Sequence, residues 1–156
     1  MWFLNHIANP LVRLILKSPL HGLLSSGLVL MIYRGKKSGK TYELPVQYAQ
    51  DGQVVYIMVG NPEQKSWWRN LRGGAPVQVV LRGQKLSGEA EVLLGQDNEA
   101  ETSAALGLYL QRFPPAARSH NLQAKPDGTY SADELYTAAS STVMVGVALE
   151  QPVTEG

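Results

Sequence analysis

The sequence predicts an α+β, mainly β fold: a small antiparallel barrel of about six strands, with helices at the N-terminus, between strands and toward the C-terminus. The 156 residues include 15 glycines and nine prolines, which favour many turns over long helices. Apolar or alternating runs of strand length recur along the chain, mostly separated by hairpin-length connections. We expect one domain over residues 1–150, followed by a tail at 151–156.

The first 27 residues predict a helical segment, with short helices over 5–16 and 20–25. The longest charge-free stretch, 18–33, has 16 residues, fewer than the roughly 20 that a membrane span needs. The chain has no cysteine, which fits the reducing cytoplasm. We therefore expect a cytoplasmic protein. The helices can pack on the domain or lie on a membrane surface, and the side chains that keep this second alternative open are Trp2, Phe3, Arg13 and Lys17.

Residues 28–95 predict the core of the barrel. Asp51 and Gly52 stand between two β-type runs and indicate a hairpin, because the tight turn needs a positive φ that glycine tolerates. Gly83 indicates a second hairpin in the same way. The expected strands cover residues 28–33, 42–49, 54–59, 77–81, 84–94 and 142–149.

Helical patterns interrupt and follow these strands. Asp97 is expected to cap one helix, and Ser131 with Glu134 forms a capping-box pattern at the start of another. We expect helices and loop over 96–140, including a loop at 119–130, and the last strand within 141–150. The expected helices cover residues 66–72, 99–112 and 131–139.

Charge is divided unevenly between the two parts of the sequence. Residues 1–85 hold 11 Lys and Arg against three Asp and Glu, a local charge of +8. Residues 86–156 hold three against ten, a local charge of −7. A basic half points to an anionic partner, unless the two halves neutralise each other in space.

The most informative segment is the basic loop, residues 34–41 (RGKKSGKT), which lies between two apolar strands. Glycines let backbone N–H groups approach an anion closely, and lysines supply charge. The phosphate loop of nucleotide hydrolases is excluded, because Gly35 and Gly39 are four residues apart instead of five and a strand follows instead of a helix. The alternatives are an anion site and a solvated hairpin tip.

Three runs carry a resemblance to a known family: RGKKSGKTYELPV, DGQVVYIMVG and KSWWRNLRGGAPVQVVLRG. In this order and spacing they resemble the deazaflavin (coenzyme F-420)-dependent nitroreductase family, within the FMN-binding-like split β-barrel oxidoreductases. The resemblance covers residues 18–95. It implies a split β-barrel whose cofactor carries the hydride chemistry while the polypeptide supplies orientation and electrostatics.

The resemblance implies an oxidoreductase that transfers hydride from a reduced deazaflavin to a small electron-poor acceptor, namely a quinone, an enone or a nitroaromatic. Two alternatives stay open: an FMN-dependent reductase, and a non-catalytic carrier of flavin, haem or lipid. The carrier is motivated by departures from the family pattern, among them Gln47 and Asn61. The resemblance also leaves a homodimer open. Nucleic acid is not expected, because the cations gather in one loop without a base-stacking aromatic motif.

Site residues follow from the resemblance by position. The basic loop would hold the cofactor phosphate and acidic tail, two strand segments would face the deazaflavin, and a short helix would open beside it. The implied cofactor-binding residues are Lys36, Lys37, Ser38 and Gly39 in the loop, Leu44, Pro45, Val46, Met58, Val59 and Gly60 in the strands, and Lys65, Ser66 and Trp67 at the helix.

Other candidates were weighed beside these. Trp67 and Trp68 are adjacent in a helix and do not share a face, so at most one of them is expected at the cofactor and the other in the core. No metal site is expected, because the three histidines lack ligand spacing. No residue is identified as catalytic. The candidate proton donors are Tyr48, Tyr56, Tyr109, Tyr130 and Tyr136.

Overall fold

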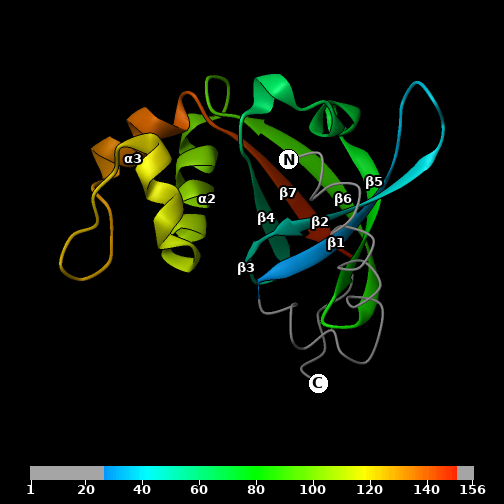
Figure 1. The fold of residues 1–156 in the computed structure, drawn as a ribbon, viewed down its shortest axis with the longest axis horizontal. Coiled ribbons are helices and arrows are strands. Elements are labelled where there is room, and N and C mark those ends of the chain that lie inside the picture. Colours follow the sequence, from blue (N-terminus) through cyan, green and yellow to red (C-terminus); the bar gives the residue numbers. More distant parts are fainter. Residues whose placement is uncertain (1–26, 151–156) are drawn as a thin grey trace.

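A computed structural model describes residues 27–150 of the chain. The helices expected over 5–16 and 20–25, the membrane contact left open for them, and the tail at 151–156 lie outside these described residues. Figure 1 shows a curled sheet with helices on one side of it. Within residues 27–150, no helix has the length and apolarity needed to cross a membrane.

Seven strands form one sheet in which every pairing is antiparallel, in the order β2-β1-β5-β6-β7-β4-β3. Within residues 27–150, two α-helices and three short 3-10 helices (η) accompany it. In chain order the elements are β1 (Leu28–Arg34), β2 (Thr41–Gln47), β3 (Ala49–Asp51), β4 (Val54–Val59), η3 (Pro62–Gln64), η4 (Trp67–Leu71), β5 (Ala75–Leu81), β6 (Gln84–Leu94), α2 (Glu99–Arg112), η5 (Pro114–His120), α3 (Ala132–Ala139) and β7 (Val143–Leu149).

The sheet curls until its two edges are joined by one stretch of chain. The expected strand over 42–49 is in fact divided: β2 lies at one edge, β3 lies at the other, and Tyr48 forms the corner between them. The backbone N–H of Tyr48 donates to the carbonyl of Gly27 at 3.3 Å, which fixes this corner beside the start of β1. The count therefore rises from the expected six to seven, and the mainly β, split-barrel expectation is confirmed.

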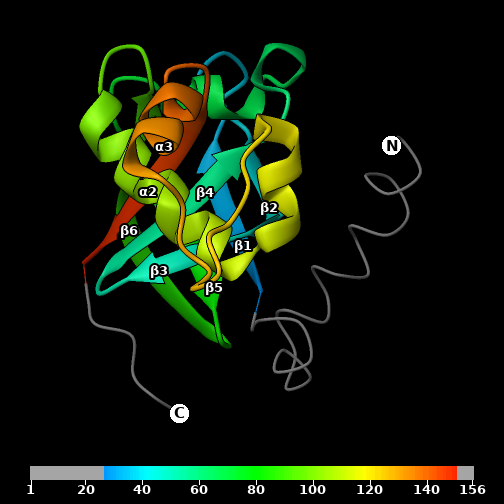
Figure 2. The ribbon, with the colours of Figure 1, turned by 90° about the vertical axis from the view of Figure 1, so that its left-hand side faces the viewer.

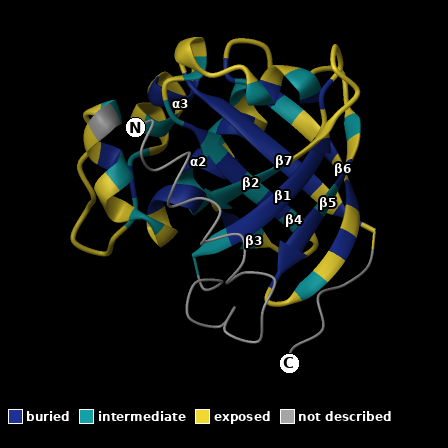
Figure 3. Cartoon of the chain, turned by 45° about the vertical axis from the view of Figure 1, so that its right-hand side comes forward, coloured by how far each residue is buried: buried dark blue, intermediate teal, exposed yellow. Residues whose placement is uncertain are grey.

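The main core fills the inside of the curl. Along β4, Val55, Ile57 and Val59 face inward and are almost fully buried, as the two-residue period of a strand requires. Figure 3 shows the same buried character along much of β1 and β7. The hairpin strand β6 alternates as expected, with Leu86, Gly88 and Ala90 buried.

The other face of the sheet carries the helical layer. Ala105 and Tyr109 of α2 pack on Leu93 and Met144, which point away from the inside of the barrel. A further cluster joins α2, η5 and α3 through Leu106, Leu110, Ala117, Leu122, Tyr130, Ala138 and Ala139. Figure 2 shows α2 and α3 lying in front of β4 and β7.

Most element boundaries agree with the sequence, and three differ for physical reasons. β5 begins at Ala75 and includes Pro76, which is tolerated because β1 pairs with β5 only between Gln78 and Val80. The N-cap of α2 is Asn98, so the expectation for Asp97 is wrong. The stretch 114–120 forms η5 and overlaps the expected loop.

Both hairpin predictions are confirmed. Gly52 has a φ of 58° in the turn between β3 and β4. In the turn between β5 and β6, Gly83 has a φ of 79° and its neighbour Arg82 also has a positive φ, 50°. Ser131 is the N-cap of α3 as expected, although its side chain makes no capping hydrogen bond.

Candidate functional site

The basic loop is held in a compact shape by its own backbone. The N–H of Gly35 donates to the carbonyl of Lys40, and the N–H of Gly39 donates to the carbonyl of Gly35, both at 2.9 Å. Gly39 has a φ of 67°, in the left-handed region where glycine is favoured. The backbone N–H of Lys40 also donates to Oγ of Ser38 at 3.2 Å. The loop is therefore a folded turn and not an open hairpin tip.

This loop docks on η4, which follows it by about 30 residues. The backbone N–H of Lys36 donates to Oδ1 of Asn70 at 3.0 Å, and Nζ of Lys36 donates to the carbonyl of Arg72 at 2.6 Å. Nδ2 of Asn70 in turn donates to the carbonyl of Trp67 at 3.1 Å. Two segments far apart in sequence are thus fastened together by polar contacts.

A cavity of about 520 Å³ opens between the loop and η4, and we call it the basic pocket. Its cations are Lys36 and Lys37 from the loop and Arg69 from η4. It is lined by Tyr33, Gly35, Lys36, Lys37, Ser38, Tyr42, Ser66, Trp67, Arg69 and Asn70. Five of the thirteen residues expected at a cofactor site therefore meet in one cavity: Lys36, Lys37, Ser38, Ser66 and Trp67.

Aromatic side chains line the basic pocket beside these cations. The rings of Tyr33 and Tyr42 stack with centroids 5.5 Å apart, and the ring of Trp67 lies tilted at 6.3 Å from that of Tyr33. The hydroxyl groups of Tyr42 and Ser38 share a hydrogen bond of 3.1 Å. Burial raises the pKa of Tyr33 above its usual value, and the neighbouring Tyr42 raises it further by a smaller amount. The hydroxyl of Tyr33 is therefore a proton donor in hydrogen bonds at neutral pH.

The position of Gly35 requires glycine. A Cβ atom there would lie 2.7 Å from Oγ of Ser38 and 2.9 Å from Cε2 of Tyr42. The ring of Tyr42 stacks on that of Tyr33, so an added side chain at Gly35 would disturb this contact. The absence of a side chain at Gly35 therefore allows Ser38 and Tyr42 to close over the loop backbone.

The two adjacent tryptophans divide as their helical spacing predicts. Trp68 is 6% exposed, packs in the main core, and donates from Nε1 to the carbonyl of Pro62 at 2.9 Å. Trp67 is half-buried and lines the basic pocket. The guanidinium of Arg69 lies 5.4 Å from the ring centroid of Trp68, a cation–π contact that orients this cation.

The expected strand residues do not share one surface. Leu44 and Val46 pair with Met31 and Val29 and pack against the main core, whereas Pro45 between them points to the opposite face. Met58 and Gly60 line a second cavity of about 390 Å³ at the end of β4, and we call it the β4-end pocket.

The β4-end pocket also contains His120, the one histidine within residues 27–150. Burial lowers the pKa of His120 below its usual value. Val59 points into the main core, although it belongs to the lining of this pocket. Five expected residues line neither cavity: Leu44, Pro45 and Val46 of β2, Gly39, which has open space around it, and Lys65, whose Nζ lies 4.0 Å from a Cβ built on Gly60.

Five lining residues of the basic pocket were absent from the expected set: Tyr33, Gly35, Tyr42, Arg69 and Asn70. Tyr42 and Arg69 adjoin the motif in sequence, and their nearness could have suggested them. The role of Asn70 depends on the docking of the loop on η4, which no local pattern shows. Within residues 27–150, no group of three or more acidic or histidine side chains is placed to hold a metal ion.

The curled sheet, the helices on its outer face and the cavity of cations and aromatic rings together define a class of protein. This architecture is that of the split β-barrel fold. The family model of F420H(2)-dependent quinone reductase matches residues 18–106, more than half of the chain. The chain belongs to this family.

Solved structures share the fold at low sequence identity. An F420-H2-dependent reductase (FDR-A) is 19% identical, with a TM-score of 0.53 over 78% of this chain and 93% of that one. A protein described as a domain-swapped dimer is 20% identical, with a TM-score of 0.58 over 88% of this chain and 93% of that one. Comparison with curated proteins gives no match.

Family membership confirms the resemblance drawn from the three sequence runs. The chain is an oxidoreductase, and its cofactor is a deazaflavin of the coenzyme F-420 type.

Proposed function

We propose that the basic pocket binds the phosphate-bearing arm of the deazaflavin, and that the chain uses the reduced cofactor to reduce a small electron-poor acceptor such as a quinone. One observation carries this proposal: Lys36, Lys37 and Arg69 meet in one cavity although they come from two separate segments. Each lysine can donate several hydrogen bonds, and the guanidinium suits the oxygens of a phosphate.

The chemistry of the pocket fits such a group. Its volume of about 520 Å³ lies in the range of small-molecule sites. The hydroxyls of Ser38 and Ser66 stand beside the cations and can donate to anionic oxygens. Charge-assisted hydrogen bonds to an anion are the strong ones in proteins, so these groups favour a phosphate over a neutral ligand.

Within this proposal the residues have distinct tasks. Lys37 and Arg69 attract the anion, Ser38 and Ser66 orient it, and Lys36 both fastens the loop to the carbonyl of Arg72 and adds charge. When bound, the deazaflavin supplies the hydride.

The strand β2 leads away from the basic pocket and would border the ring of the cofactor along its edge. Its side chains Leu44, Pro45 and Val46 are each half-buried, so each retains some exposed apolar surface. The role assigned to Met58, Val59, Gly60 and Lys65 stays a prediction, because these residues lie at the β4-end pocket or beside it.

The test is a titration of the purified protein with the deazaflavin, in which binding is monitored by tryptophan fluorescence. Replacing Lys36 and Lys37 together with alanine should weaken binding at least tenfold, because two charge-assisted contacts of about 1.5–3 kcal/mol each are lost. Lys40→Ala is the matched control: it removes the same charge from the same loop but lies outside the pocket lining. A thermal melt of each variant reports whether the fold is kept. Equal affinity for wild type and double variant would contradict the proposal.

Two further measurements separate the alternatives. FMN also carries a phosphate on its side chain but lacks the acidic tail beyond it, so a parallel titration with FMN measures how strongly the basic pocket prefers the deazaflavin. A steady rate of quinone reduction by the deazaflavin-loaded protein tests the quinone as the acceptor. The homodimer stays a prediction, for which the mass of the protein in solution is the direct measurement.

A further inference from the structure

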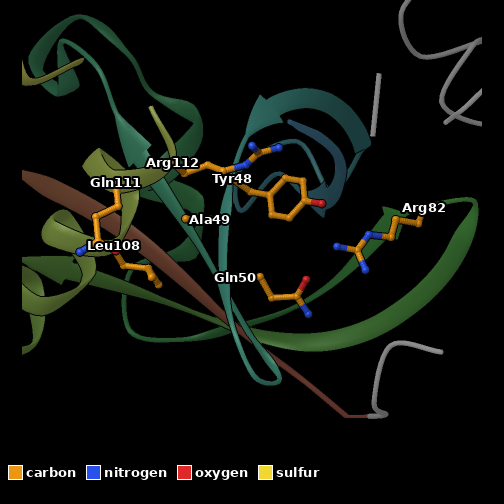
Figure 4. Close-up of a pocket in the computed structure, with 7 residues that line it drawn as sticks. All are labelled: Tyr48, Ala49, Gln50, Arg82, Leu108, Gln111 and Arg112. Carbon is orange, nitrogen blue, oxygen red and sulfur yellow. The ribbon is translucent and has the colours of Figure 1, made fainter. Parts of the chain in front are cut away.

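A third cavity, of about 400 Å³, lies away from the basic pocket, and we call it the arginine pocket. Figure 4 shows Arg112 above the ring of Tyr48, with Arg82 on the other side of that ring. The described residues that line it are Tyr48, Ala49, Gln50, Arg82, Leu108, Gln111 and Arg112. They come from the corner after β2, from β3, from the turn between β5 and β6, and from the last turns of α2.

The two arginines extend from well-defined backbone positions. Arg82 lies in the hairpin turn with a φ of 50°, so the turn geometry defines the backbone position from which its side chain extends. The guanidinium of Arg112 lies 5.6 Å from the ring centroid of Phe113, a cation–π contact. Between them, Tyr48 is 4% exposed and Ala49 is equally buried, so closely packed residues form the inner wall of the cavity.

The lining is cationic and amide-rich. Its seven described residues include two guanidinium groups and two primary amides but no carboxylate. Nε2 of Gln50 already donates to the carbonyl of Gly52 at 2.9 Å, which holds this amide in place. Arginine presents a planar fork of donors that matches a carboxylate, so the chemistry of the cavity suits a small ligand with an acidic group.

The location connects this cavity to the proposed cofactor site. The basic loop precedes Thr41 at one end of β2, and Tyr48 follows Gln47 at the other end. Seven strand residues at about 3.3 Å each span roughly 20 Å. The hydroxyl of Tyr109 donates to Oε1 of Gln47 at 3.3 Å, which fastens α2 to this end of β2. One strand therefore has a cationic cavity at each end.

We propose that the arginine pocket binds an acidic group of the electron acceptor, so that the substrate class is electron-poor aromatic carbonyl compounds, such as quinones, that carry a carboxylate. This inference rests on the proposed function, because the acceptor must meet a cofactor that extends from the basic pocket along β2. In the reaction, the acceptor gains a hydride from the reduced deazaflavin and a proton from solvent and becomes the hydroquinone. The deazaflavin is oxidised by two electrons, and the carboxylate is unchanged.

The test compares two probes of nearly the same shape: anthraquinone-2-carboxylate and the uncharged 2-methylanthraquinone. Calorimetry with cofactor-free protein gives the affinity of each, and steady-state assays with reduced deazaflavin give KM and kcat. Wild-type protein should bind the carboxylate at least tenfold more tightly than the methyl compound, because charge-assisted hydrogen bonds are gained. Salt should reduce this difference.

Three variants locate the effect. Arg82→Asn keeps a residue that tolerates the positive φ, and Arg112→Gln keeps much of the side-chain length. Each should reduce carboxylate affinity several-fold and raise KM with little change in kcat, while 2-methylanthraquinone is unaffected. Lys85→Gln is the control, since it removes one charge from the same hairpin outside the cavity lining. A thermal melt of each variant checks the fold.

The proposal is overturned if wild-type protein binds the two probes equally, or if the arginine variants behave like Lys85→Gln. Failure of the proposed function is a separate result: the double variant at Lys36 and Lys37 would bind the deazaflavin as tightly as wild-type protein does. In that event the calorimetric comparison on cofactor-free protein still decides whether the arginine pocket recognises a carboxylate.

Discussion

The basic pocket and the arginine pocket are both cationic, but they are built in different ways. In the basic pocket, Lys36 is fastened to Asn70 and to the carbonyl of Arg72, so the loop is positioned before any ligand arrives. In the arginine pocket, Arg82 and Arg112 extend from separate elements and are exposed. A preorganised site loses less conformational entropy on binding. The comparison therefore assigns tight, selective binding to the basic pocket and weaker, more adaptable binding to the arginine pocket.

The largest effect on this comparison is expected from Gly35→Ala. The new Cβ would meet Ser38 and the stacked ring of Tyr42 within 3 Å, and overpacking of this kind costs about 1–3 kcal/mol. Deazaflavin affinity should fall sharply, whereas binding of anthraquinone-2-carboxylate at the arginine pocket should be unchanged. Fluorescence titration and calorimetry measure the two.

The control for this substitution is Gly39→Asn in the same loop. Its position has open space around it, and asparagine tolerates the φ of 67°. This variant should keep deazaflavin affinity. Equal losses in the two variants would show that the loop tolerates no change anywhere, and would refute the specific role of Gly35.

A moderate effect is expected from Asn70→Ala. The backbone N–H of Lys36 loses its acceptor, which should lower the free energy of unfolding by about 0.5–1.5 kcal/mol and loosen the loop. Asn70→Asp retains an oxygen acceptor and should therefore stay closer to wild type in stability. Urea denaturation measures both variants. If Asn70→Ala is as stable as wild type, the basic pocket is not fastened in the way described.

The smallest effect belongs to His120, which lies in neither of the two pockets. Burial holds its pKa below the value of about 6.5 in an unfolded chain. The unfolded state then binds more protons, so this contribution to stability is complete above pH 6.5 and is lost as the pH falls through the lowered pKa. His120→Gln should flatten the decline in thermal stability on acidification. An identical decline in both proteins would show that His120 is not its source.

The basic pocket was predictable because its lysines, glycines and serine are contiguous and lie between two clear strands. Helical spacing predicted that Trp67 and Trp68 point in different directions. It did not predict which of the two faces the core. Pro45 shows a missed signal, since strand alternation already places it opposite Leu44 and Val46.

The arginine pocket was not predictable, for a different reason. Arg82 and Arg112 are 30 residues apart, and only the curl of the sheet brings both to Tyr48. The division of the strand at Tyr48 was equally hidden. Tyrosine favours strands, and neither glycine nor proline marks the corner. What bends the chain there is tertiary: the corner bonds to Gly27, and β3 has its partner in β4.

The chain runs directly from β2 at one edge of the sheet to β3 at the other edge. The opening between these two edge strands therefore has two different ends, one at Tyr48 and one toward Thr41. At Tyr48 the two margins are covalently continuous, so they cannot separate there. Toward Thr41 no ladder pairs β2 with β3, and within residues 27–150 β1 is the one strand that pairs with β2. Thermal opening of the barrel should therefore begin beside the basic loop and become harder toward the corner, so amide protons of residues 41–43 should exchange with solvent sooner than those of residues 46–48.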